Sequence, residues 1–171
     1  MPTTFISYNR QDIDFVEQIE HALQENEITT WREKGELYGE KGWPKVIGEA
    51  IESHNNFLAV WSKNSAISHI VEFEWNMAIL LQRKILAVSL DDSAFRDNMR
   101  PTYSVSWLNS ENPVKDLLNA IHTPMAEIDT NSIQGVLKKL SRFNETKPAQ
   151  VTRKMRIVYF NSHIENPQVH I

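Results

Sequence analysis

Five short apolar segments of the sequence alternate with segments that carry apolar residues at helical spacing. The strand-like segments are residues 3–7, 28–31, 56–61, 84–90 and 103–107. Strands that alternate with helices in this way predict a parallel sheet whose two faces are covered by helices and whose connections are right-handed. We expect the strand order 2-1-3-4-5, by analogy with other five-stranded sheets of this kind.

The third and fourth of these segments, residues 56–61 and 84–90, are largely continuous apolar runs. Strands of this kind are buried on both faces, which agrees with a flavodoxin-like α/β fold. Ligands of such folds bind beyond the carboxyl ends of the strands where the winding reverses, here between the first and third strands. The loop from Ser7 to Asp12 and the segment that leads to Glu74 should therefore border one crevice.

Glu74 belongs to a segment that starts as a loop and continues as a helix. Serine and asparagine at residues 62–65 supply loop and helix-capping groups. The helix that follows has one apolar stripe, formed by Val71, Trp75, Ala78 and Ile79. Glu74 lies beside this stripe, so a packed helix should hold its carboxylate near the end of the third strand. Most glutamates on helices are simply solvated, and Glu72, on another side of the helix, is interpreted in that way.

Composition excludes several classes of function. The 171 residues include no cysteine, which excludes thiol catalysis, disulfides and cysteine-bound zinc, and the six histidines lack the paired spacing of metal ligands. We therefore expect no metal and no cofactor. A net charge of -4 argues against nucleic-acid binding. The absence of a long apolar run or a signal-peptide pattern favours a cytoplasmic protein that makes no membrane contact.

Residues 123–171 differ in pattern from the first 122. A helical segment near residues 132–143 is followed by a linker-like stretch at residues 144–148 and a strand-like stretch at residues 155–160. Because a single strand is not stable alone, this stretch is either an extra arm or the start of a truncated second domain, and we prefer the second interpretation. We expect one domain at residues 1–122 and a C-terminal extension at residues 123–171.

Three motifs of the first 122 residues together resemble those of the TIR domain (Toll/interleukin-1 receptor type), particularly of its bacterial, enzymatic branch. The sequence Phe5-Ile6-Ser7-Tyr8 is similar to the family's first motif, at the end of strand one. Residues 31–47 are similar to its second strand, the BB loop and the following helix. Residues 62–74 match the exit of strand three and the helix that bears the family's catalytic glutamate. The resemblance covers roughly residues 3–122.

The resemblance implies that Glu74 is the catalytic residue of an NAD+ nucleosidase, for which NAD+ is a substrate and not a bound cofactor. The products would be nicotinamide and ADP-ribose or a cyclic variant. The residues then expected at the substrate are Ser7, Tyr8, Asn9, Arg10, Trp31, Glu33, Leu37 and Ser62. The resemblance also implies a bacterial immune effector that is activated by assembly. Its expected partners are other TIR domains and a C-terminal sensor domain in a longer protein, and the isolated chain should be weakly active.

Two positions depart from the family pattern. The family often has tryptophan four residues before the catalytic glutamate, where this chain has Ile70. In some bacterial members that tryptophan is linked to cyclisation of the product, so a cyclic product does not follow for this chain. The family also favours aspartate after strand two, where Glu33 is the nearest acidic residue.

The chemistry can also be argued without the resemblance. Nicotinamide is positively charged in NAD+ and leaves as a neutral group, so no general acid is needed, and one fixed carboxylate can stabilise an oxocarbenium-like transition state. The scattered glycines lack a dinucleotide fingerprint, which argues against hydride transfer. A phosphoacceptor domain is rejected because the first and third strands do not end in the required aspartates. The alternative that stays open is a non-catalytic module that docks onto other TIR domains in signalling.

Overall fold

A computed structural model describes residues 1–34 and 42–125 of the chain. Its sheet has five parallel strands in the order β2-β1-β3-β4-β5. The strands are β1 (Thr3–Ser7), β2 (Thr29–Trp31), β3 (Asn56–Trp61), β4 (Lys84–Ser89) and β5 (Tyr103–Ser106). The predicted fold class and strand order are confirmed. The helix and strand expected within residues 126–171 lie outside the described residues.

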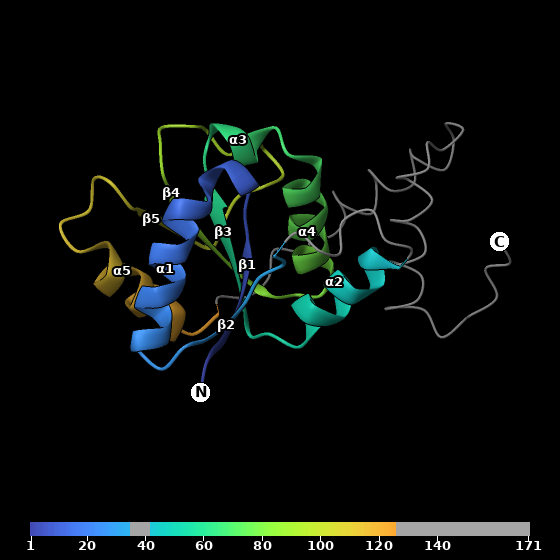
Figure 1. Cartoon of the computed structure of the whole chain (residues 1–171), viewed down its shortest axis with the longest axis horizontal. Helices are drawn as coiled ribbons and strands as arrows, with labels where there is room; N and C mark the ends of the chain where they lie inside the picture. The colour runs from blue at the N-terminus through green and yellow to red at the C-terminus, as the bar shows by residue number, and fades with distance from the viewer. Residues whose placement is uncertain (35–41, 126–171) are drawn as a thin grey trace, which may run out of the picture.

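Helices cover both faces of the sheet (Figure 1). On one face lie α1 (Ile13–Glu25) and α5 (Pro113–His122), and on the other lie α2 (Trp43–Glu52) and α4 (His69–Leu80). Two short helices stand beyond the carboxyl ends of the strands, the 3-10 turn η1 (Arg10–Asp12) after β1 and α3 (Lys63–Ala66) after β3. The sequence predicts loop and helix-capping groups at residues 62–65. Ser62 does cap a helix, but the loop part of the prediction is wrong, because the four residues after Ser62 form the helical turn α3.

Two hydrophobic cores lie on opposite sides of the sheet because successive strand residues point to opposite faces. In β1 and β3, Phe5 and Phe57 belong to the core under α2 and α4, whereas Ile6 and Leu58 belong to the core under α1 and α5. The rings of Phe5 and Phe57 stack with their centroids 5.7 Å apart. All six residues of β3 are buried, as expected for the central strand of a sheet covered on both faces.

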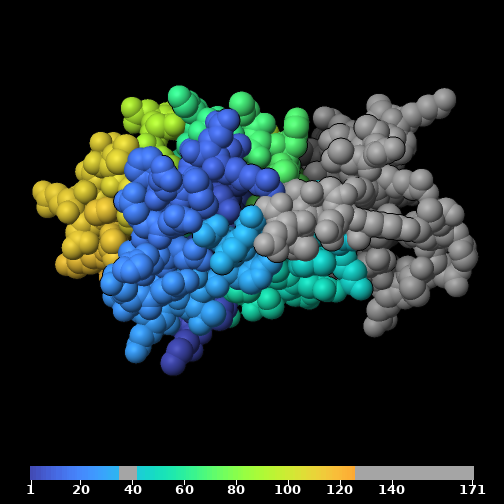
Figure 2. Space-filling model, in the orientation of Figure 1, coloured from blue at the N-terminus to red at the C-terminus, as the bar shows by residue number. Residues whose placement is uncertain are grey.

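The edge of the sheet at β2 reaches the molecular surface. In the space-filling view the short stretch of β2 and the residues after it lie between α1 and α2, which cover opposite faces (Figure 2). Residues of β2 are exposed or half-buried, in contrast to those of β3. The loop that follows this strand therefore leaves the sheet beside the carboxyl end of β1.

The helix α4 is buried on almost every side. Residues from Val71 to Ile79 are buried except for Glu72, which is half-buried. The single apolar stripe predicted from the sequence is thus too narrow a description. The helix contacts α2, β1, β3 and β4, and this surrounding explains why polar residues such as Asn76 are also buried.

Candidate active site

Glu74 lies in the middle of α4, and its side chain is buried, with the residue 2% exposed. The helix begins at a serine cap, because the Ser68 hydroxyl accepts a hydrogen bond from the backbone N–H of Val71 at 3.3 Å. This cap and the packing of α4 on the sheet fix the direction in which the carboxylate points. A buried carboxylate is costly unless it is hydrogen-bonded, so its partners are informative.

Ser7 is one of those partners. Its hydroxyl donates a hydrogen bond of 2.6 Å to Glu74 Oε2, and Ser7 itself is 0% exposed. Ser7 is the last residue of β1 and pairs with Ala59 of the neighbouring β3. An O–H donor to a carboxylate at this distance is a strong, charge-assisted contact. The end of β1 and the helix that bears Glu74 therefore meet at this contact.

Asp12 joins the loops that follow β1 and β3. Its Oδ2 accepts a hydrogen bond of 2.6 Å from the Ser62 hydroxyl, and its Oδ1 accepts one of 2.8 Å from the Asn64 side-chain amide. Asp12 is the residue before α1, but its side chain makes no capping hydrogen bond to that helix. Its hydrogen bonds cross to the loop after β3.

Two residues predicted at the substrate belong to this same junction. The Asn9 side-chain amide donates to the backbone carbonyl of Asn64 at 3.2 Å. The Ser62 hydroxyl, besides donating to Asp12, accepts from the backbone N–H groups of Asn64 and Ser65 and so caps α3. Ser62 is 3% exposed, and its hydroxyl proton is already used within the protein. Its position therefore favours a role in holding the loop.

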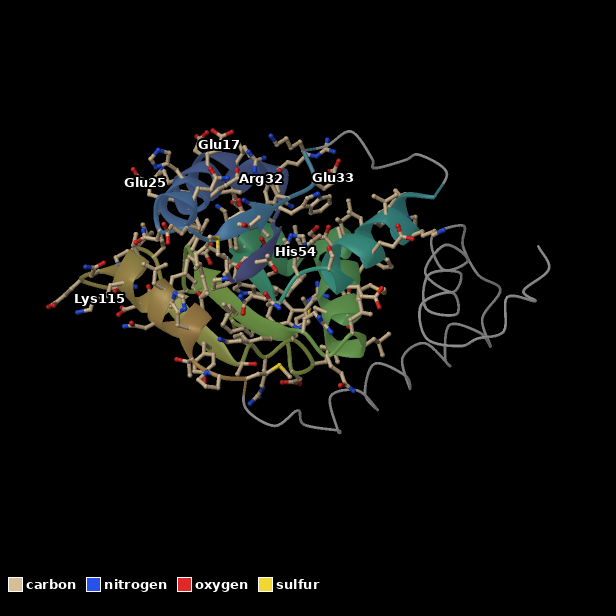
Figure 3. The ribbon with its side chains drawn as sticks, turned by 90° about the horizontal axis from the view of Figure 1, so that it is seen from below. Glu17, Glu25, Arg32, Glu33, His54 and Lys115 are labelled. Carbon is tan, nitrogen blue, oxygen red and sulfur yellow. The ribbon has the colours of Figure 1, made fainter. Side chains whose placement is uncertain are left out.

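Tyr8 fixes the start of the loop after β2. Its hydroxyl donates to the backbone carbonyl of Glu33 at 2.9 Å and accepts from Arg32 Nη1 at 3.2 Å. Arg32 is in turn paired with Glu20 of α1 at 2.8 Å and with Glu17 at 3.5 Å, beside which it lies in Figure 3. Burial alone would lower the pKa of Arg32, but its hydrogen bonds and charge interactions with Glu20 and Tyr8 outweigh this effect and raise the pKa. The guanidinium of Arg32 therefore stays charged and holds the start of this loop against α1.

Arg10 and Glu33 form a contact between the loops after β1 and β2. Arg10 Nη2 lies 3.9 Å from Glu33 Oε2, and the Arg10 side chain is 60% exposed whereas that of Glu33 is 2% exposed. Among the predicted substrate-binding residues, Arg10 is thus a charged residue with a largely exposed side chain. Both residues were predicted at the substrate, and they do lie at the same end of the sheet.

Trp31 and Leu37 complete the predicted set. Trp31 is half-buried, and its indole stacks on Phe5 with ring centroids 5.0 Å apart. This stacking connects the edge strand to the core. Leu37 lies outside the described residues.

Three charged residues have structural roles that the sequence did not reveal. The first two, Glu72 and Arg96, form an ion pair of 2.9 Å. Glu72 was predicted as a surface residue, and Arg96 lies in the segment between β4 and β5. Lys84 is 5% exposed, and its ammonium donates to the backbone carbonyls of Ala120, Ile121 and Thr123 at the end of α5. A lysine as the first residue of an apolar strand is a weak signal for such a helix cap.

Two properties of residues 1–34 and 42–125 bear on cofactors and membranes. These residues contain no group of three or more His, Asp or Glu side chains that could hold a metal ion. None of their helices combines the length and apolar character needed to cross a membrane.

Comparison with known proteins identifies the family. A model of the TIR domain matches residues 4–120, which is more than half of the chain, and the chain therefore belongs to the TIR-domain family. A comparison with curated proteins gives no match.

Two solved structures are similar to this chain. One is a CMP N-glycosidase, BcmB, from Clostridium botulinum, with 15% identity over 68% of this chain and 94% of that chain and a TM-score of 0.50. The other is a prokaryotic SEFIR domain, with 14% identity over 86% of this chain and 95% of that chain and a TM-score of 0.47. At this identity the first likeness concerns the fold alone.

Proposed function

We propose that this chain is an NAD+ nucleosidase in which Glu74 stabilises the cationic transition state. The observation that carries the proposal is the 2.6 Å hydrogen bond between the Ser7 hydroxyl and Glu74, in a member of the TIR-domain family. This bond supports the proposal because it orients a buried carboxylate at the carboxyl end of β1, beside the point where sheets of this order bind ligands.

The reaction needs little more than an oriented negative charge. The bond between nicotinamide and the ribose carbon breaks, its electron pair leaves with the nicotinamide, and the cationic ribose is attacked by water, which releases one proton to solvent. The Glu74 carboxylate faces the developing positive charge and lowers the barrier. The products are nicotinamide and ADP-ribose. A cyclic product is the finer alternative, and Ile70 in place of the family's tryptophan favours the linear one.

The charge of the leaving group favours NAD+ over a nucleotide with a neutral base. Cytosine departing from CMP would carry a negative charge unless a side chain protonated it, whereas nicotinamide departs neutral. We assign Arg10 to the diphosphate of NAD+, because its side chain is 60% exposed and guanidinium groups bind phosphate oxygens well. Tyr8 and Asn9 stand in the same loop after β1, and Ser62, Trp31 and Glu33 support that loop and its neighbours.

The burial of Glu74 favours a second candidate function. A carboxylate that is 2% exposed and bonded to Ser7 also suits a purely architectural role, as expected for a docking module of TIR assemblies. For catalysis, the surroundings of Glu74 must open when NAD+ binds or when copies of the domain assemble. This requirement is consistent with an enzyme that is weak as an isolated chain and is activated by self-association.

The test measures loss of NAD+ by chromatography at high protein concentration and under crowding, with CMP as a second substrate. We expect Glu74→Gln to reduce NAD+ cleavage by about a hundredfold or more, since it removes the charge while keeping the side-chain size. Glu72→Gln is the matched control on the same helix. Glu72 pairs with Arg96 and not with Ser7, so this substitution should leave the rate nearly unchanged. Equal rates for wild type and Glu74→Gln would remove the enzymatic proposal. Self-association without any NAD+ loss would favour the docking module.

A further inference from the structure

One buried carboxylate makes two of the side-chain hydrogen bonds between the loops after β1 and β3. Asp12 is 7% exposed, and each of its two oxygens accepts a hydrogen bond from a residue 50 or more positions away, Ser62 at 2.6 Å and Asn64 at 2.8 Å. Asn9 adds a third bond of 3.2 Å from its side-chain amide to the carbonyl of Asn64. Side-chain bonds therefore join the two loops here, beyond the last paired residues of β1 and β3.

Both ends of the Ser7–Glu74 contact are connected to this junction. On one side, Ser7 stands two residues before Asn9 in the loop after β1. On the other side, Ser62 caps α3, whose end is followed by the backbone bond from Ser68 N–H to Ser65 at 3.1 Å and then by α4. Because α4 is enclosed by its neighbours, a change in the spacing of the two loops would shift the end of β1, with Ser7, relative to Glu74.

We propose that Asp12 is a positioning residue that sets the alignment of Glu74 at the candidate active site, an inference that rests on the proposed function. Asp12 acts through Ser62 and Asn64, and the bonds given above use both of its oxygens for this purpose. Its position as the residue before α1 would allow it to cap that helix, but its side chain makes no such bond. Both oxygens of the Asp12 carboxylate thus accept hydrogen bonds from the loop after β3.

A charge swap across the junction tests this role. In Asn64→Asp, a second carboxylate at a half-buried position faces the buried Asp12 carboxylate, and the two negative charges repel each other and separate the loops. The double variant Asp12→Asn with Asn64→Asp restores one carboxylate and one amide in exchanged positions. Asp12→Asn alone is the milder variant, since the Asn64 amide can turn over to offer its oxygen, and it keeps the test usable if Asn64→Asp does not fold.

Two readouts separate this inference from the proposed function. The first readout is the separate measurement of kcat and KM for NAD+. We expect Asn64→Asp to lower kcat by about tenfold to a hundredfold, and we expect the double variant to recover most of that loss. The second is amide hydrogen exchange, which we expect to accelerate at residues 9–12 and 63–66 in Asn64→Asp and return in the double variant. Exchange in α5 should stay unchanged in all variants and serves as the internal control.

Each result supports or overturns the positioning role. Faster exchange in Asn64→Asp with an unchanged kcat would overturn it while leaving the nucleosidase proposal intact, and so would a double variant as impaired as the single one. If Asn64→Asp does not fold, Asp12→Asn decides: a kcat equal to that of wild type together with faster exchange at residues 9–12 and 63–66 would overturn the role, and a lower kcat with faster exchange would support it. If wild type cleaves no NAD+, the proposed function and the positioning role of Asp12 in catalysis by Glu74 fail together, and the exchange data alone then show whether Asp12 joins the loops.

Discussion

Removal of the Ser7 hydroxyl should destabilise the fold through Glu74. Ser7 is 0% exposed and Glu74 is 2% exposed, so no solvent replaces the hydroxyl as a donor when Ser7 becomes alanine. The lost bond is short, 2.6 Å, and its acceptor is a carboxylate. Hydrogen bonds to charged groups contribute about 1.5–3 kcal/mol, and a buried carboxylate that loses a donor also retains its cost of desolvation.

We therefore expect Ser7→Ala to lower the free energy of unfolding by about 2 kcal/mol at neutral pH. Urea unfolding followed by the fluorescence of the buried tryptophans measures this value, because Trp61 and Trp75 are 0% exposed. The matched control is Ser89→Ala: Ser89 also ends a parallel strand, but its hydroxyl lies 3.5 Å from the Ser104 hydroxyl. That substitution should change the free energy by less than about 0.5 kcal/mol.

A double-mutant cycle shows whether the effect passes through the Ser7–Glu74 contact. The cycle combines Ser7→Ala with Glu74→Gln and compares the double variant with the two single ones. We expect a coupling of about 1 kcal/mol or more, since the charge-assisted part of the bond is lost in either single variant. A cost of Ser7→Ala equal to that of Ser89→Ala, or a coupling near zero, would refute the reasoning and weaken the case for Glu74 as an oriented group.

Two further predictions concern other parts of the domain. Lys84→Met should lower the free energy of unfolding by about 2 kcal/mol, because three carbonyls at the end of α5 lose their donor, whereas exposed Lys115→Met should have little effect in the same urea assay. Burial alone would raise the pKa of Asp91, but hydrogen bonds from Lys63 and Ser93 outweigh it and hold the pKa below its ordinary value of 3.8. The folded state thus favours the carboxylate, so the extra stability of wild type over Asp91→Asn should be complete above pH 3.8 and fall as the pH drops through the lowered pKa. A difference that grows on acidification would contradict this sign.

Strands with abrupt polar ends could be predicted from the sequence with the observed bounds. The predicted segments at residues 3–7 and 56–61 match β1 and β3, since each apolar run stops at a serine or at a tryptophan followed by serine. The central position of these strands then placed the loop at Ser7 and the helix of Glu74 at one end of the sheet. That inference needed only topology, which is why it agrees with the contact between Ser7 and Glu74.

The contacts that hold the loops could not be predicted in the same way. The helix α3 has four residues, which are too few to show a helical period, so the sequence alone predicts a loop there. Asp12 stands where a helix-capping carboxylate is common, and the sequence holds no sign that its partners are 50 and 52 residues away. The ion pair of the half-buried Glu72 with Arg96 could not be predicted either, because Arg96 lies in a segment without regular structure.

The packing of α4 limits how this domain can be regulated and how it can diverge. A helix enclosed by a sheet and a second helix cannot rotate easily. Any rotation of α4 that turned Glu74 outward would break the ring contacts of Phe73 and Trp75, the residues on either side of Glu74. Control by a partner or by assembly is therefore expected to act on the connections at the end of the sheet and to leave the helix in place. By the same argument, variants with altered turnover should be sought in those connections, where sequence changes do not have to preserve the volume of the core.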